Sequence, residues 1–124
     1  MNNVYLALIN RIREFTDKEV YNGQAADDAK YPYAVIKLGP IENTEKDRDD
    51  YMLTVSCWDK RVSPSHAHAV ALAEEVRSAL LDYRHLDDNQ LIIVSRPSVG
   101  NIPDPDEQIK RYDVTALIKT YRRS

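Results

Sequence analysis

Cysteine, glycine and long apolar runs are all scarce in this 124-residue chain, and each scarcity excludes a class of protein. The single cysteine, Cys57, cannot form an internal disulfide, so a small disulfide-stapled secreted fold is excluded. Only three glycines are present, at positions 23, 39 and 100, too few and too scattered for a phosphate-binding loop. No apolar run approaches the roughly 20 residues that a membrane-spanning helix needs, and Met1–Tyr5 does not resemble a signal peptide. We expect one cytosolic domain over residues 1–124.

Histidine is also scarce, and the three histidines do not form a metal-binding or catalytic pattern. His66 and His68 are two residues apart, so on a helix they diverge by roughly 200° and cannot share a metal. His85 stands alone, and nothing around Cys57 resembles an activated nucleophile. The acidic run Asp47–Asp50 lacks the glycine and the final glutamate of a calcium loop. We therefore expect no enzyme activity, no catalytic residue, no metal and no cofactor.

Charge is nearly balanced over the whole chain but is uneven along it. Seventeen Lys and Arg against twenty Asp and Glu give a net charge of −3, which argues against general nucleic-acid binding. Residues 42–50 are mainly acidic, whereas residues 110–124 are mainly basic. These opposite charges predict an interface for self-association or docking, with the following candidate residues: Glu45, Asp47, Asp49, Asp50, Lys119, Arg122 and Arg123. Solvated surface charge is the alternative explanation.

Tyrosine is abundant, with eight residues against one Phe and one Trp. A tyrosine side chain combines apolar area with a polar tip, so it suits a binding surface better than a dry core. The alternative is that several tyrosines lie at strand ends with their hydroxyl groups in water. Both interpretations remain open at the level of sequence.

Hydrophobic periodicity predicts a helix over about residues 3–15 and a second helix that starts at Ser63-Pro64 and fades near Tyr83. In the second helix, the apolar positions Leu72, Val76 and Leu80 fall on one face. Ser63 is the expected N-cap, with Pro64 in the first turn. The sequence therefore predicts two helices.

Alternating patterns predict four strands, in segments 33–38, 51–59, 91–94 and 109–121, with turn-rich loops at 22–30 and 100–107. The first two strands should pair as one antiparallel hairpin, and the last two should pair as a second. On the final strand we expect Tyr112, Val114, Ala116 and Ile118 to face inward. The predicted fold is α+β: a small antiparallel sheet of about four strands with two helices on one face, in the order α-β-β-α-β-β.

This order of elements, and several local patterns, resemble the tail completion (tail terminator, tail-to-head joining) proteins of long-tailed bacteriophages. The matching features are Pro-Tyr-Ala-Val-Ile at 32–36, the acidic loop, Cys-Trp-Asp at 57–59, the helix segment Ala73–Leu80 and a final hairpin with a charged last strand. The resemblance covers nearly the whole chain.

The resemblance implies a structural phage or prophage protein that caps the tail tube as a homo-oligomeric ring, expected to be a hexamer because the tube has six-fold symmetry. Such a ring ends tail growth and forms the interface to the head connector. The implied partners are other copies of the chain, the major tail tube protein and the head completion protein, with no membrane and no specific nucleic acid. The implied location is the tail–head junction of the virion, after assembly in the host cytoplasm. The alternatives are a small α+β enzyme subunit and a host adaptor with no phage role.

Overall fold

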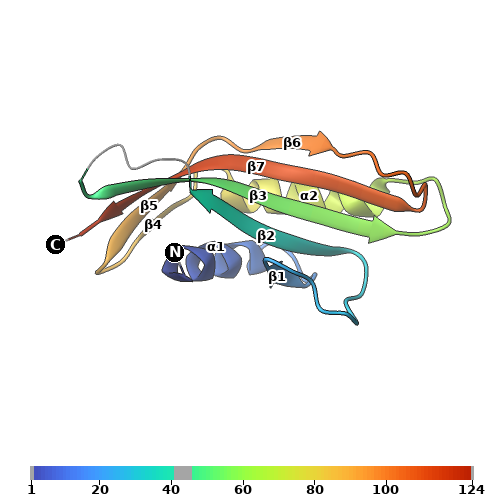
Figure 1. The fold of residues 1–124 in the computed structure, drawn as a ribbon, viewed down its shortest axis with the longest axis horizontal. Coiled ribbons are helices and arrows are strands. Elements are labelled where there is room, and N and C mark those ends of the chain that lie inside the picture. Colours follow the sequence, from blue (N-terminus) through green and yellow to red (C-terminus); the bar gives the residue numbers. More distant parts are fainter. Residues whose placement is uncertain (1, 41–45, 124) are drawn as a thin grey trace.

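The computed structural model describes residues 2–40 and 46–123. In these ranges the chain forms two helices and seven strands (Figure 1), in this order: α1 (Asn2–Arg13), β1 (Val20–Asn22), β2 (Tyr33–Pro40), β3 (Arg48–Lys60), α2 (Ala67–Leu80), β4 (Arg84–Leu86), β5 (Gln90–Val94), β6 (Ser98–Asn101) and β7 (Ile109–Arg122). Neither helix is long and apolar enough to cross a membrane.

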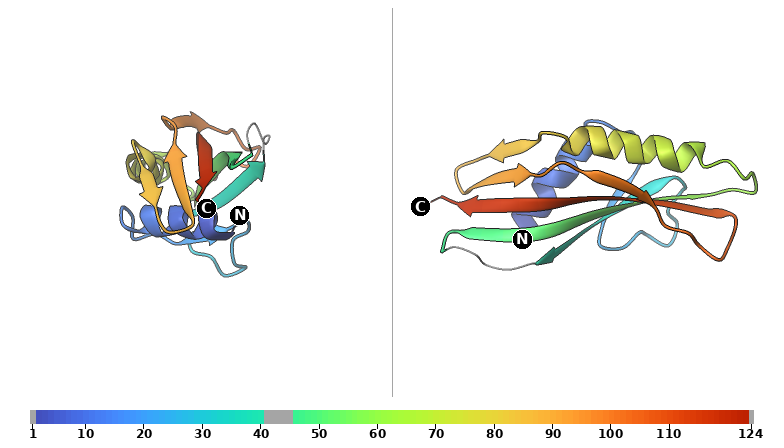
Figure 2. Two further views of the ribbon diagram at one scale, coloured as in Figure 1. Left: turned by 90° about the vertical axis from the view of Figure 1, so that its left-hand side faces the viewer. Right: turned by 90° about the horizontal axis from the view of Figure 1, so that it is seen from above.

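The strands form one mixed sheet in the order β1-β2-β3-β7-β5-β4, and β6 pairs with the first half of β7. The pair β1–β2 is parallel, whereas the other pairs are antiparallel. The two longest strands, β3 and β7, pair from Arg48↔Tyr121 to Lys60↔Ile109 and run the length of the molecule as one ribbon. The sheet curls into a half-barrel around the helices, as the end-on view in Figure 2 shows.

The predicted four-stranded α+β sheet is therefore wrong, because the fold is mostly β with a curled, mixed sheet. The strands β1, β4 and β6, which have three, three and four residues, were not part of the predicted sheet, although a short extended piece was expected around residues 19–21, where β1 lies. A segment of three residues is too short to show the alternation that identifies a strand. The β6 sequence Ser-Val-Gly-Asn is polar and lies between Pro97 and Pro103, so it is typical of a loop. The two predicted antiparallel pairings, β2–β3 and β5–β7, are confirmed.

The core lies between the helices and the inner face of the sheet. From α2, Leu72, Val76 and Leu80 are at most 1% exposed. They belong to one buried cluster with α1 and with residues of the strands β1, β2, β3, β5 and β7, which include Leu53, Val55, Val114 and Ile118. The predicted inward faces of the second helix and of the last strand are confirmed in this cluster, although Tyr112 is only partly buried. Burying a Leu or Val side chain contributes roughly 1.5–3 kcal/mol, so this cluster is a major source of stability.

The predicted N-cap at Ser63 is wrong, because α2 begins at Ala67. The hydroxyl of Ser63 accepts the N–H of Ser65 (3.2 Å), and the hydroxyl of Ser65 accepts the N–H of Ala67 (3.2 Å). Serine side chains that bind the backbone two residues ahead favour turns over helix. The carbonyl of Ser63 also accepts a hydrogen bond from the Lys110 ammonium (2.9 Å), which holds this segment against β7.

Candidate assembly interface

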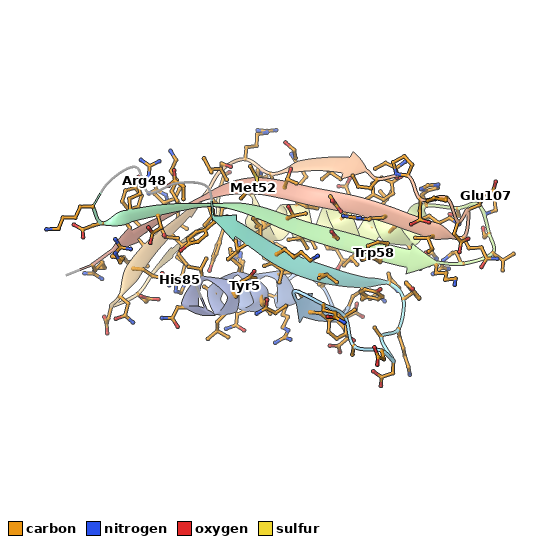
Figure 3. All side chains as sticks on the ribbon, in the orientation of Figure 1. Tyr5, Arg48, Met52, Trp58, His85 and Glu107 are labelled. Atoms are coloured by element: carbon orange, nitrogen blue, oxygen red, sulfur yellow. The ribbon has the colours of Figure 1, made fainter. Side chains whose placement is uncertain are left out.

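The acidic and basic segments that the sequence separates by about seventy positions lie side by side, because β3 and β7 are antiparallel neighbours. In their register, Asp49 lies opposite Thr120 and Asp50 opposite Lys119. We call residues 46–50 together with residues 119–123 the charged end. Figure 3 shows this end of the molecule at Arg48 and the opposite end at Glu107.

Ion pairs within the chain already join the two segments of the charged end. The Arg122 guanidinium donates to the Asp49 carboxylate (2.5 Å) and to the carbonyl of Lys46 (2.6 Å). Arg48 donates two hydrogen bonds to the carboxylate of Asp50, both 2.9 Å long. This bidentate contact lowers the pKa of Asp50 below its usual value of 3.8. Part of the opposite charge is thus compensated inside one copy.

The other predicted interface residues also lie at the charged end where the structure describes them. Asp47 is exposed, and its carbonyl accepts the Arg122 N–H (2.7 Å). Arg123 is exposed and donates to the Asp87 carbonyl at 2.8 Å, while Lys119 is partly exposed. Glu45 lies outside the described residues. The sequence suggested two separate patches of opposite charge, and the structure brings their described members into one mixed-charge surface.

The opposite end of the β3–β7 ribbon contains a buried lysine. Lys110 is 2% exposed. The nitrogen of its ammonium group lies within hydrogen-bond distance of four backbone carbonyl oxygens in two loops, at Arg61 (3.1 Å), Ser63 (2.9 Å), Glu107 (2.8 Å) and Gln108 (3.3 Å). One cation therefore fixes the loop after β3 to the loop before β7. We call this region the lysine end.

A second charge is buried at the lysine end. Asp59, opposite Lys110 in the β3–β7 register, is 0% exposed and pairs with Arg61 (2.5 Å), and this contact raises the pKa of Arg61. Sequence reasoning missed Lys110 and Asp59, although a signal existed for the lysine. Lys110 has the same parity as Tyr112 and Val114, so the alternation that faces those residues inward also faces Lys110 inward. A charge at such a position requires internal partners.

The outer sheet face carries aromatic side chains beside a groove of about 370 Å3. The guanidinium of Arg111 lies 4.8 Å from the ring centroid of Trp58. Tyr33 contacts both Tyr31 and Tyr21, with ring centroids 5.1 and 5.8 Å apart. Aromatic residues and arginine are enriched in protein interfaces, so this face is a further candidate binding surface. The tyrosine count was the signal for it in the sequence.

The cysteine and one histidine that the sequence offered as reactive groups lie in different surroundings. Cys57 is fully buried, and burial raises the pKa of its thiol to about 12, so it is not a thiolate near neutral pH. His66 Nδ1 lies 3.1 Å from the hydroxyl of Tyr112. Among the described residues, no group of three or more His, Cys, Asp or Glu side chains could hold a metal ion.

A family model described as "Tail completion protein gp17" matches residues 5–121 of this chain. The chain therefore belongs to the family of phage tail completion proteins, which is a structural family and not an enzyme family. The predicted family is confirmed, and the protein has a structural role in the phage tail.

Two solved structures share the fold. A chain of the "Virion of native gene transfer agent (GTA) particle" matches with a TM-score of 0.57 and 13% identity, over 94% of this chain and 84% of that chain. A second solved structure matches with a TM-score of 0.63 and 11% identity, over 100% of this chain and 96% of that one. No curated protein sequence matches this chain.

Proposed function

We propose that the protein caps the phage tail tube as a homo-oligomeric ring of six copies, ends tail growth and forms the interface to the head connector. The observation that carries this proposal is membership of the tail completion family over residues 5–121. The resemblance of the fold to a chain of a gene transfer agent virion supports it.

The surfaces of the molecule suit such an assembly. A closed ring needs a heterologous contact, in which one surface of a copy meets a different surface of the next copy. The charged end, the aromatic outer face and the strand edges are different surfaces of one small domain. They supply enough chemically distinct surface for contacts with a neighbouring copy, the tail tube and the connector.

The charged end is the proposed docking surface for the next copy or the tail tube. Its acids lie in residues 46–50 and its bases in both segments, so a partner with a complementary pattern would bind both signs of charge. Each exposed pair contributes only about 0–1 kcal/mol, so the effect comes from several pairs together and weakens with salt.

The test of the ring is electron microscopy of phage particles assembled without this protein. We expect tails that do not join heads and whose tubes vary in length. Adding the purified protein should restore joining and place a ring at the head-proximal end of the tail. Normal tails and normal joining without the protein would contradict the proposal. Joining restored by the protein without any ring at the tail end would contradict the capping role.

A further inference from the structure

The edge strand β6 exposes unpaired backbone groups in a defined pattern. All four of its residues are exposed, and among the described residues no strand lies beyond it. The N–H of Ile102 donates to the carbonyl of Arg111 (2.9 Å), and the register pairs Gly100 with Asp113. Hydrogen-bonded pairs recur at every second residue of an antiparallel ladder. The backbone N–H and C=O groups of Val99 and Asn101 therefore point away from β7.

The opposite edge of the sheet is protected against such pairing. There β2 extends beyond the three-residue strand β1, which pairs only with Ala34–Ile36. The N–H of Leu38 on this stretch donates to the hydroxyl of Tyr5 (2.8 Å), and Pro40 has no N–H. Blocked backbone donors and prolines are among the means of preventing strand addition. By contrast, the segment Ser98–Asn101 contains neither a charged residue nor a proline.

The edge strand β4 also has backbone N–H and C=O groups that point away from the sheet, at every second residue as on β6. The N–H of Val94 donates to the carbonyl of Tyr83 (3.1 Å), and the N–H of Asp87 donates to the carbonyl of Gln90 (3.0 Å). His85 lies two residues from both Tyr83 and Asp87, so its backbone groups also point toward β5. The backbone groups of Arg84 and Leu86 therefore point outward. Leu86 is 63% exposed and Val99 is 42% exposed, so each edge has one exposed aliphatic residue whose backbone groups point away from the sheet. Val99 pairs with the buried Val114 on the inner face, whereas Leu86 pairs with Leu91 on the outer face, so pairing of the two residues turns the inner face of one copy to the same side as the outer face of the next.

We propose that β6 of one copy pairs antiparallel with β4 of the next copy, with Val99 opposite Leu86 and Asn101 opposite Arg84. Each of these pairs exchanges both backbone N–H···O=C bonds, and the two aliphatic side chains meet. The proposal rests on the proposed ring. It names the contact between neighbouring copies.

The charged residues next to β6 and β4 favour an antiparallel over a parallel arrangement of the two strands. In the antiparallel register, exposed Arg96 of one copy lies beside exposed Asp88 of the next, and exposed Arg84 lies toward Asp104. In a parallel register, Arg84 would instead lie beside Arg96. Like charges at neighbouring cross-strand positions destabilise a pair, whereas opposite charges stabilise it. The antiparallel arrangement is therefore favoured.

The contact is heterologous, because β6 and β4 are different surfaces that belong to different parts of the β3–β7 ribbon (Figure 1). β6 pairs with Tyr112–Thr115 of β7, while β5 and β4 extend the sheet from the segment Ile118–Arg122. A head-to-tail contact repeats from copy to copy and closes into a ring when the rotation per copy allows it.

Cysteine cross-linking tests the contact directly. Hydrogen-bonded antiparallel neighbours have Cα atoms about 5.5 Å apart, within the roughly 4.4–6.8 Å range of disulfides. The double variant V99C/L86C, assembled on tails and mildly oxidised, should give a ladder of disulfide-linked multimers. Either single variant alone should give none, and a mixture of the two should give dimers only. The native Cys57 is buried with a raised thiol pKa and should not contribute.

The matched control is V62C/L86C, since Val62 is 85% exposed and would react faster if random collisions formed the disulfides. A second test is Val99→Lys, which should reduce assembly about tenfold or more with the fold intact, while Val62→Lys should not. Rings on tails that form no V99C–L86C disulfide would overturn the inference and leave the ring standing. A V99C variant that cross-links to itself would also overturn it. The absence of any oligomer, free or on tails, would refute the proposed function.

Discussion

Charged side chains gather at both ends of the β3–β7 ribbon, but they are buried at one end and mainly exposed at the other. At the lysine end, Lys110 and Asp59 are buried, and their partners belong to the same chain. At the charged end, Arg122 and Arg123 are exposed, and their ion pairs and hydrogen bonds lie at the surface. Figure 3 shows the two ends at Glu107 and Arg48.

This difference separates charge that builds the fold from charge that is available to a partner. A buried ammonium without acceptors would be very costly, so the four carbonyl groups around Lys110 must stay in place whenever the chain is folded. Exposed ion pairs are nearly neutral for stability and exchange easily with water or with another protein. We therefore expect changes at the lysine end to alter stability and changes at the charged end to alter assembly.

The largest expected change in the free energy of unfolding comes from the core between the two ends. Truncating Leu72 to alanine should cost about 2–5 kcal/mol, because it removes a fully buried side chain from α2 and leaves a cavity. Urea unfolding followed by circular dichroism measures this loss. Leu6→Ala on α1 is the matched control, since Leu6 is 59% exposed and should change stability by less than about 0.5 kcal/mol. Equal losses at both sites would contradict the assignment of the core face.

At the lysine end, Lys110→Met should destabilise the protein by about 2–4 kcal/mol, since it keeps the aliphatic stem of a buried side chain but removes the ammonium group that binds the loop carbonyl groups. The same unfolding measurement applies. Lys60→Met, at an exposed position of β3, should be close to neutral. If the two variants unfold at the same urea concentration, the buried ammonium does not fix the loops.

At the charged end, reversal of Asp47, Asp49 and Asp50 to lysine should slow or abolish addition to tails. Reversing Lys119, Arg122 and Arg123 as well should partly restore addition. Joining of purified tails to heads, at low and high salt, measures the effect, which should weaken as salt rises.

The control for this reversal is the triple variant D17K/D27K/D28K, which changes the net charge equally at exposed positions elsewhere. If the D47K/D49K/D50K protein joins tails to heads normally at every ionic strength, the charged end is only solvated surface.

The smallest expected effect is a pH dependence at the charged end. Because Arg48 lowers the folded-state pKa of Asp50 below 3.8, the ion pair contributes stability above about pH 3.8, and this contribution is lost as the pH falls through the lowered pKa. The difference in unfolding midpoint between the native chain and Asp50→Asn should therefore be present near pH 5 and shrink near pH 2.5. A constant difference across this range would show that the carboxylate is not stabilised by Arg48.

Long, strongly patterned elements could be predicted from the sequence, and short ones could not. Both helices, the long strands β3 and β7 and their inward faces follow from periodicity. Tertiary contacts stabilise β1, β4 and β6, because each is an edge strand held by a longer neighbour. The sequence also suggested the charged residues of the candidate interface. That Asp49 meets Arg122 within one chain depends on the register of two strands far apart in sequence.

The sequence by itself determined the family, the two helices, the inward faces of the long strands and the uneven distribution of charge, because these depend on local composition and periodicity. Only the tertiary structure decided the curled sheet of seven described strands, the burial of Lys110 among four carbonyl groups and the exposed edges of β4 and β6. The physical reason is that strand pairing joins residues distant along the chain. The free energy of such pairing depends on which neighbours are present, and a local pattern does not contain that information.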